Sequence, residues 1–489
     1  MSIIDLNKFL NLFVYDPKSP MLFNTGFFMF LFLVFIFFYQ FVEKNKTIKV
    51  LYLIAFSYFF YYKSSGIFFT LLIFSTIVDY YLAKWIDKTE HKAGRKAILI
   101  ISLLVNFGLL GYFKYTNFFI DIVNDVSNKN ISHLNIFLPI GISFYIFQSL
   151  SYTIDIYRKK LKPLSSIFDF SFYISFFPHI VAGPIVRAID FLPQIRKNKV
   201  IDRFDIGYAL YLIIGGLFKK AIISDYISIN FVDRVFDNPT LYSGFENLMA
   251  VYGYALQIYC DFSGYSDMAI GIALLLGYRL KMNFDSPYQS SSITEFWRRW
   301  HISLSSWLKD YLYISLGGNR KGKIRQYFNL MVTMLLGGLW HGASWKFIMW
   351  GGLHGIALSI EKMFKIPDIV KKNVIFKIIG VIITFHIVCL CWIFFRATSF
   401  ESAIIIMKQI VNAFNPDIAL QVIVGYKEVF ILFALGYALH FIPKNIELFI
   451  QNKFSLTPFI LKPIVLAMVI WLVIQVKSSD IQPFIYFQF

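Results

Sequence analysis

The residue best placed to do chemistry in this sequence is a histidine within an apolar stretch. His341 follows Gly337 and Gly338 and precedes Gly342. Glycines at such positions let another backbone or a substrate approach closely. A neutral imidazole, with an ordinary pKa of about 6.5, is suited to act as a general base near neutral pH. The alternative is a structural histidine that holds two helices together.

Other histidines lie in the same half of the chain. His301 follows two arginines and Trp300 and is interpreted as an interfacial group, with a structural hydrogen bond as the alternative. His354 and His386 are expected to have structural roles.

The sequence contains no motif for a metal or a bound nucleotide. His341 and His354 have no close-spaced ligand partner, and no His-Glu-x-x-His or Cys/His cluster occurs. Cys389 and Cys391 are too close for the usual zinc spacing, so they and Cys260 are interpreted as apolar packing residues. The absence of a phosphate-binding glycine loop argues against a nucleotide-driven pump.

His301 and His341 lie in a stretch, 261–355, that keeps polar residues beside strongly apolar ones. It begins with Asp261 and Asp267 in an otherwise apolar block. Ionisable groups at membrane depth are costly and usually line a cavity. The motifs at 283–287 (Asn-x-x-Ser-Pro) and 317–319 (Gly-Gly-Asn) are expected to break helices. The stretch therefore predicts a re-entrant or cytoplasm-facing centre around a polar cavity.

Long apolar blocks must hold this centre. The chain is 57% hydrophobic with a mean hydropathy of +0.60, against roughly 45–50% apolar residues in soluble domains. About 20 apolar residues in a helix cross a membrane. The blocks lie at 21–42, 51–62, 67–83, 97–120, 136–154, 170–185, 206–223, 250–275, 330–360, 374–395, 429–442 and 463–476. They predict an all-α integral membrane protein, one domain over 1–489, with about eleven transmembrane helices plus re-entrant or broken helices.

The positive charge of the chain is arranged in alternate loops. Lys and Arg number 47 against 29 Asp and Glu, a formal net charge of +18. The loops at 84–96 and 158–162 are basic, and the loop between them, 121–135, is nearly neutral. The positive-inside rule then places the basic loops in the cytoplasm and the N-terminus outside. The charge forms no stripe beside an aromatic platform, so nucleic acid is not an expected partner, while binding of an acidic polymer stays open.

Several motifs together resemble the membrane-bound O-acyltransferase family. They are closest to its bacterial alginate and peptidoglycan O-acetyltransferase branch, and less like its D-alanyl transferase branch. The resemblance covers about residues 21–396. The motifs lie at 139–145, 182–187, 261–267, 286–288, 296–305, 310–313, 317–320 and 335–343.

The resemblance implies a ring of helices around a central tunnel, with His341 as the catalytic histidine and His301 as the second family histidine. It implies acetyl transfer from cytoplasmic acetyl-CoA, a substrate rather than a bound cofactor, to an extracytoplasmic polysaccharide. Peptidoglycan is favoured over alginate or another exopolysaccharide. A multi-pass protein of the bacterial cytoplasmic (inner) membrane is expected, in contact with lipid and with a periplasmic or extracellular SGNH-type acetyltransferase. The alternative function is a transporter or flippase of a polysaccharide precursor.

Basic residues of the polar centre are candidates for holding the donor. Arg298, Arg299, Asn319 and Arg320 are expected to attract the phosphates of acetyl-CoA. The alternative is ordinary positive charge on cytoplasmic loops.

The chain ends in an aromatic tail over 483–489. The tail resembles the C-terminal motif of the small membrane partner in the D-alanylation system, in which a tyrosine is thought to carry the acyl group. Tyr486 is therefore a candidate acyl relay. The alternative is an interfacial aromatic anchor.

Overall fold

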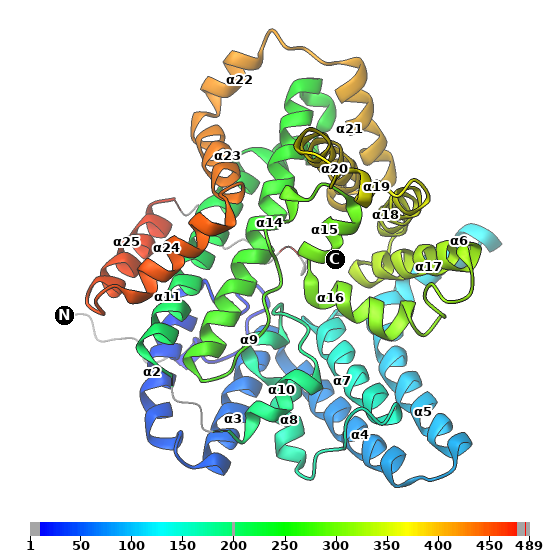
Figure 1. Ribbon diagram of the computed structural model, residues 1–489, viewed down its shortest axis with the longest axis vertical. Helices are drawn as coiled ribbons and strands as arrows, with labels where there is room; N and C mark the ends of the chain where they lie inside the picture. The colour runs from blue at the N-terminus through cyan, green and yellow to red at the C-terminus, as the bar shows by residue number, and fades with distance from the viewer. Residues whose placement is uncertain (1–9, 198–200, 477–484, 486–489) are drawn as a thin grey trace. The chain divides into compact units, whose positions relative to one another are not determined.

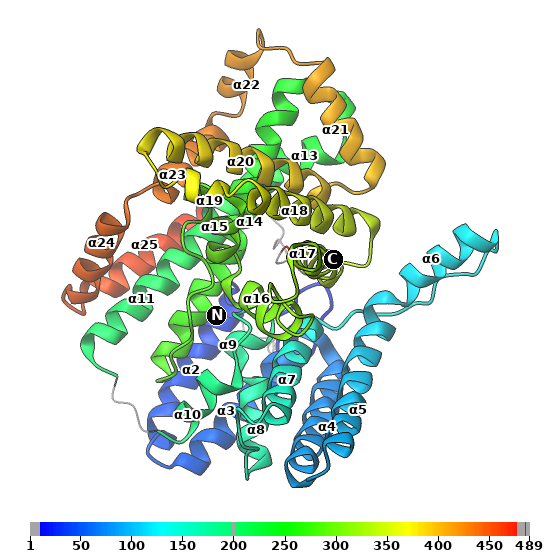
Figure 2. The same cartoon turned by 45° about the vertical axis from the view of Figure 1, so that its right-hand side comes forward.

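The structure is a computed structural model that describes residues 10–197, 201–476 and 485 (Figures 1 and 2). Every regular element in this part of the chain is a helix, which confirms the expected all-α class. The chain divides into two compact units. The first contains the residues up to 202 together with 272–281, and the second contains 203–271 and the residues from 282 onward.

Helices of very different lengths build the first unit. They are α2 (Gly26–Val42), α3 (Lys46–Ser65), η1 (Gly66–Phe68), α4 (Phe69–Lys88), α5 (Lys92–Leu110), η2 (Gly111–Tyr115), α6 (Thr116–Ser127), α7 (Ile142–Tyr157), α8 (Ile167–Ser175), α9 (Phe177–Ile180) and α10 (Ala188–Ile195). Helices α4, α5 and α7 pack against one another as a three-helix group (Figure 2).

A buried polar cluster joins those three helices. The Asp79 carboxylate of α4 accepts hydrogen bonds from Ser102 Oγ (2.7 Å) and Asn106 Nδ2 (2.9 Å), both on α5, and from Ser149 Oγ on α7. All four side chains are buried. Polar side chains that hydrogen-bond across helices are a recognised way of holding apolar helices together in a membrane.

The second unit contains the polar centre. Its elements are α11 (Arg203–Leu217), η3 (Phe218–Ser224), α12 (Asp225–Ile227), η4 (Ser228–Val232), α13 (Asp233–Asp237), η5 (Pro239–Leu241), α14 (Gly244–Leu275, whose last residues belong to the first unit), η6 (Pro287–Gln289), α15 (Ile293–Arg299), α16 (Ile302–Trp307), η7 (Leu308–Tyr313), α17 (Lys323–His341), α18 (Trp345–Met363), α19 (Ile366–Ile369), α20 (Val374–Arg396), α21 (Phe400–Asn412), α22 (Ala419–Gly425), α23 (Lys427–His440), α24 (Lys444–Leu456) and α25 (Leu461–Val476). Helices α17 and α18 lie side by side, and α11 packs on α24 and α25 (Figure 2).

The expected helix breaks are confirmed. The chain between α14 and α15 is irregular except for the single turn η6, and Ser286 has a φ of 43° directly before Pro287. Gly317 and Gly318 have φ values of 109° and 57°, in the left-handed region that favours glycine. The polar centre is thus assembled from short helices joined by sharp turns.

The number of membrane spans that the structure supports is lower than eleven. Among the described residues, four helical segments are long and apolar enough to cross a membrane, at 46–88, 92–127, 203–237 and 374–396. Two sharply bent pairs, 419–440 and 444–475, raise the number to six. Several blocks that the sequence analysis counted as spans are short or split: α7 has 16 residues, and the block 330–360 is divided between α17 and α18. Neither the count of eleven nor the tunnel is confirmed, and the single-domain organisation stays a prediction.

Candidate active site

His301 and His341 both contact the ring of one tryptophan, Trp340. The centroid of the Trp340 ring is 5.9 Å from that of His301 and 5.0 Å from that of His341. Both histidines are buried, with exposed fractions of 0% and 3%. The structure therefore brings together two residues that stand 40 positions apart in the sequence.

Each histidine stands at a helix break. His301 lies between α15 and α16 with a φ of 42°, a conformation that few residues other than glycine adopt. His341 is the last residue of α17, and the extended Gly342 follows it. The left-handed conformation of His301 is of a kind that is concentrated at functional sites.

Asn283 fixes the orientation of the His301 ring. The Asn283 side-chain oxygen lies 3.3 Å from His301 Nδ1, and it accepts hydrogen bonds from Ser303 N (3.1 Å) and Ser303 Oγ (2.9 Å). Because this oxygen can only accept, Nδ1 of a neutral His301 carries the proton and Nε2 carries the lone pair. A ring in this tautomer presents a base at its Nε2 end.

Aromatic rings surround His341 and exclude water from it. Besides Trp340, the rings of Trp350 and Phe395 lie edge-on at 5.0 Å and 5.2 Å from the His341 ring. Electrostatic interactions with a reacting group are stronger in such dry surroundings than in water.

The glycines around His341 bring α18 close, as the sequence predicted. A Cβ atom on Gly338 would lie 2.2 Å from the Phe347 carbonyl oxygen, and one on Gly342 would lie 2.1 Å from the Phe347 ring. Any larger residue at either position would push α18 away from α17. The sharp corner between these helices therefore needs both glycines, and it places Trp350 against His341.

A basic cleft of 690 Å³ lies beside α15 and the start of α20. Its lining residues are Asp285, Ser291, Ser292, Thr294, Glu295, Arg298, Arg299, Pro367, Val370, Lys371, Asn373, Val374 and Lys377. Arg298, Lys371 and Lys377 are exposed, and the N-terminal end of α20 faces the same space. Cationic side chains together with the positive end of a helix dipole favour an anion.

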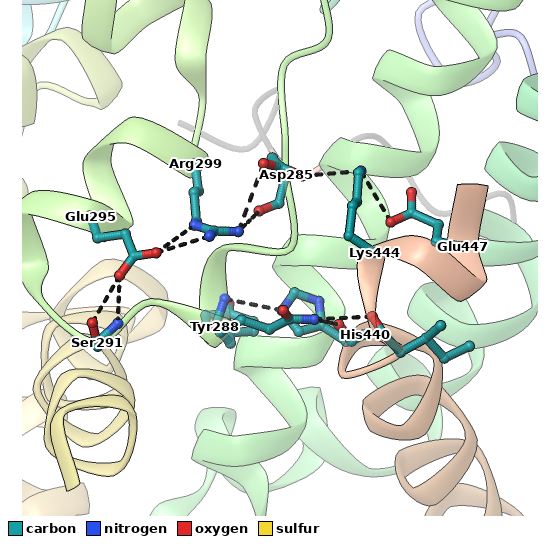
Figure 3. Close-up of polar contacts among 10 residues, drawn as sticks. Asp285, Tyr288, Ser291, Glu295, Arg299, His440, Lys444 and Glu447 are labelled. Atoms are coloured by element: carbon teal, nitrogen blue, oxygen red, sulfur yellow. Dashed lines mark hydrogen bonds and ion pairs between the residues drawn. The ribbon is translucent and has the colours of Figure 1, made fainter. Parts of the chain in front are cut away.

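Arg299 belongs to a chain of alternating charges that crosses this region (Figure 3). Its guanidinium lies 2.9 Å from Glu295 Oε1 and 3.7 Å from Asp285 Oδ2. Asp285 also pairs with Lys444 at 3.1 Å, and Lys444 pairs with Glu447 at the same distance. Arg299 therefore ties α15 to Asp285, while Arg298 lines the cleft.

Hydrogen bonds and charge hold Glu295 ionised. Burial raises the pKa of this carboxyl, but hydrogen bonds from Ser291 N (3.0 Å) and Ser291 Oγ (2.9 Å) and the Arg299 charge lower it by more. The net pKa is below the ordinary value, so Glu295 is an anion throughout the neutral range.

Asn319 and Arg320 lie elsewhere. Both are exposed on the 317–322 loop, which Asn329 anchors through a hydrogen bond from its side-chain nitrogen to the Gly318 carbonyl (2.9 Å). They do not belong to the lining of the basic cleft. The structure thus separates the four residues expected to attract the donor into two places.

Tyr486 lies outside the described residues, but its neighbour Ile485 is described. Ile485 is 3% exposed, and its N–H donates a hydrogen bond to Asp261 Oδ2 at 2.9 Å. The next residue on α14, Phe262, packs edge-on against His301 with a centroid distance of 4.6 Å. Position 485 is therefore tied to the helical turn that contacts His301.

Sequence reasoning missed the partner of Asp261. Lys220 Nζ lies 2.5 Å from Asp261 and 2.8 Å from Asp225, and Lys219 pairs with Asp267 at 2.5 Å. Two adjacent lysines in the apolar block 206–223 were the signal, because buried charges in membrane helices are usually paired. Asn283 was noted only as part of a helix-breaking motif, since no sequence spacing reveals that its side chain reaches His301.

The cysteines are confirmed as buried and free, in keeping with packing roles. Within the described ranges, no group of three His, Cys, Asp or Glu side chains has the arrangement to hold a metal ion.

Comparison with known proteins gives a consistent result. The model of the membrane-bound O-acyltransferase family matches residues 9–404. The chain is 39% identical over 422 residues to the peptidoglycan O-acetyltransferase of Helicobacter pylori (strain ATCC 700392 / 26695), covering 80% of each chain. It is 41% identical over 395 residues to the Probable alginate O-acetylase AlgI of Pseudomonas syringae pv. tomato, covering 78% of this chain and 74% of the relative. Similarity to the teichoic acid D-alanyltransferase of Bacillus subtilis (strain 168) is lower, 29% over 55% of this chain and 71% of the relative.

Proposed function

Because the chain belongs to the membrane-bound O-acyltransferase family and is a multi-pass membrane acyltransferase, we propose that it moves acetyl groups from cytoplasmic acetyl-CoA to an extracytoplasmic polysaccharide. The observation that carries this proposal is the pair of buried histidines that both contact the Trp340 ring. Of the two functions that the sequence left open, the relatives named as acyltransferases favour the enzyme over the transporter.

The reaction needs a base and a dry site. His341 removes the proton of the attacking hydroxyl as its oxygen bonds to the thioester carbon. The carbon–sulfur bond breaks, and the thiolate of CoA takes up a proton. His301, held by Asn283, accepts through Nε2 a hydrogen bond from a donor group of the bound substrate other than the attacking hydroxyl and so orients the substrate. The aromatic walls keep water from competing for the acyl group.

The basic cleft suits the phosphates of the donor. Arg298, Lys371 and Lys377 are not opposed by the carboxylates of the cleft, because Arg299 and Lys444 already pair with Glu295 and Asp285. Under the positive-inside rule such a basic surface faces the cytoplasm, where acetyl-CoA is made available. The cytoplasmic (inner) membrane is therefore the proposed location.

Tyr486 is proposed to carry the acetyl group across to an acceptor outside. The hydrogen bond from Ile485 to Asp261 supports this role. It anchors the residue next to Tyr486 at Asp261, and Phe262, which follows Asp261 in the chain, contacts the His301 ring. A phenol ester transfers its acyl group to a sugar hydroxyl downhill, since phenolate is the better leaving group. A periplasmic or extracellular SGNH-type acetyltransferase is the proposed recipient, and peptidoglycan is favoured over alginate as the final acceptor.

The test uses the full chain in membrane vesicles with acetyl-labelled acetyl-CoA. The wild type is expected to form a labelled ester on the chain and on the polymer. His341→Ala is expected to abolish both while its thermal midpoint stays within about 2 °C. Transfer at the wild-type rate in that variant would show that His341 is not the base.

A second variant isolates the relay. Tyr486→Phe keeps the size and apolar character of the tail and removes only the hydroxyl. It is expected to lose the labelled ester on the chain and the acetylation of purified cell wall. If cell-wall or exopolysaccharide acetylation persists at the wild-type level, the tail is an interfacial anchor.

Orientation is tested independently of activity. Single cysteines in the loops 88–96 and 158–162, in a background without Cys260, Cys389 and Cys391, are expected to resist a membrane-impermeant thiol reagent in intact cells. Labelling from outside would reverse the proposed topology.

A further inference from the structure

Four buried nitrogen atoms beside His341 make no hydrogen bond within the described part of the chain. They are Nδ1 and Nε2 of His354 and the indole Nε1 atoms of Trp297 and Trp350. His354 is 0% exposed and Trp350 is 1% exposed. The structural role that the sequence suggested for His354 would require such hydrogen bonds. A buried polar group without a partner destabilises the folded protein, so each of these nitrogens calls for an explanation.

These atoms belong to three rings in mutual contact. The His354 ring lies 5.0 Å from that of Trp297 and 4.9 Å from that of Trp350, and the two indoles are 5.6 Å apart. The three planes are steeply inclined to one another, at 71–77°. Trp350 also contacts His341 at 5.0 Å. The unpartnered nitrogens are therefore gathered in one place, one ring away from the proposed base.

The chemistry of this group defines what it can bind. A neutral imidazole offers one donor and one acceptor, and each indole offers one donor. The carbonyl oxygen of a secondary amide accepts two hydrogen bonds and its N–H donates one, so a single amide satisfies three of the four nitrogens. A phosphate offers no donor and is better served by the cationic side chains of the basic cleft.

Helix α15 connects this group to the basic cleft. Arg298 lines the cleft, while the adjacent Trp297 takes part in the ring cluster. A donor that carries phosphates at one end, amides along its arm and a thioester at the tip would meet these three environments in that order. Its thioester would then reach the neighbourhood of His341.

We propose that His354, Trp297 and Trp350 form a subsite that hydrogen-bonds the amide-bearing arm of the acyl donor. The proposal rests on the proposed use of acetyl-CoA. It assigns to His354 a contact with substrate that is distinct from the proton transfer at His341.

The test measures binding without turnover. The purified full chain in detergent is unfolded thermally with and without reduced pantetheine, which carries the amides and lacks the phosphates and the acetyl group. Three proteins are compared: the wild type, His354→Phe and His354→Gln. His440→Phe serves as a buried control, because His440 Nε2 accepts a hydrogen bond from Tyr288 N at 3.0 Å (Figure 3).

Pantetheine is expected to raise the midpoint of the wild type, to leave that of His354→Phe unchanged and to raise that of His354→Gln in part. Without pantetheine, His354→Phe is expected to be at least as stable as the wild type, since it removes unpartnered polar atoms, whereas His440→Phe is destabilised. In the transfer assay, His354→Phe is expected to raise KM for acetyl-CoA about tenfold, the loss of one or two hydrogen bonds.

Three results would overturn the subsite. They are no shift of the wild type, equal shifts of the wild type and His354→Phe, or a loss of stability in ligand-free His354→Phe like that of His440→Phe. If wild-type protein binds pantetheine but forms no acetyl ester, the proposed acetyl transfer fails while the subsite stands.

Discussion

Two buried polar regions of the molecule differ in whether their polar atoms have hydrogen-bond partners. In the first unit, the Asp79 carboxylate is surrounded by donors from its own protein: Ser102, Asn106 and Ser149. In the second unit, the nitrogens of His354, Trp297 and Trp350 are equally buried but have no such partner within the described residues. Both regions look alike in the sequence, as single polar residues within apolar helices.

This difference in hydrogen bonding indicates which of the two regions serves stability and which serves function. A polar cluster that satisfies itself holds helices together, and nothing remains for a ligand to bind. A cluster with unpartnered atoms is a cost to the folded protein, and a substrate can relieve that cost. The Asp79 cluster is therefore expected to respond to mutation in its stability, and the histidine region in its activity.

The largest effect is expected from His301→Phe. Phenylalanine preserves the ring contacts with Phe262 and Trp340 and removes both nitrogens. The transfer rate is expected to fall about 100-fold, the usual cost of a substrate that is no longer held in the reactive geometry. Because phenylalanine tolerates a φ of 42° less well than histidine, transfer is measured per folded molecule, well below the thermal midpoint. A matched control, Asn283→Asp, keeps an acceptor for Nδ1. A fall in stability large enough to explain the lost activity would place His301 with Asp79 among structural groups.

The converse variant is Asp79→Ala. It leaves the donors of Ser102, Asn106 and Ser149 without their carboxylate, so the free energy of unfolding is expected to fall by roughly 3 kcal/mol. Transfer per folded molecule, measured well below the midpoint, is expected to stay at the wild-type level. Ser75→Ala, which removes only a 3.4 Å contact to Asn106, is the mild control. Loss of transfer in folded Asp79→Ala would break the comparison.

A smaller effect is expected at the donor phosphates. Arg298→Ala is expected to raise KM for acetyl-CoA about fivefold at low salt and less at high salt, because screening weakens exposed charges. Arg320→Ala is the matched control, an exposed arginine outside the lining of the cleft. If Arg320→Ala has the larger effect, the 317–322 loop holds the phosphates and the basic cleft does not.

The sequence was sufficient for the all-helical fold class, while the roles of the site residues stay predictions. Long apolar blocks made the all-helical class plain, and the Gly-Gly-Asn and Ser-Pro motifs located the breaks because turn chemistry is local. His341 was singled out because an ionisable imidazole next to three glycines in an apolar helix usually serves a purpose other than packing. The lower similarity to the D-alanyltransferase also agrees with the branch that the motifs indicated.

Contacts between distant segments were beyond the reach of the sequence. No spacing shows that Asn283 turns toward His301, or that Lys220 meets Asp261 from another helix. The count of eleven spans is not confirmed, because hydropathy does not distinguish a crossing helix from two short helices joined at a corner, as at α17 and α18. The unpartnered nitrogens of His354 were likewise invisible, since partnership depends on every neighbouring side chain.

The smallest effect of a substitution on stability is expected at Glu295, whose carboxylate has hydrogen-bond partners but is partly exposed. Burial raises the pKa of this carboxyl, but Ser291 and Arg299 outweigh it and bring the pKa below the ordinary 4.5. A carboxyl with a depressed pKa adds stability above its unfolded-state pKa and loses it as the pH falls through the folded-state value.

Glu295→Gln is therefore expected to lower stability by about 1 kcal/mol or less at pH 7, the modest value of a partly exposed pair. The gap between its thermal midpoint and that of the wild type should close as the pH falls below 4.5. A gap that stays constant down to pH values at which Glu295 is protonated would show that the Glu295 charge contributes nothing. Of the two carboxylates compared with the unpartnered nitrogens, only Asp79 would then remain as a group that stabilises the fold through hydrogen bonds within its own protein. Glu295 is the other carboxylate, and it borders the site.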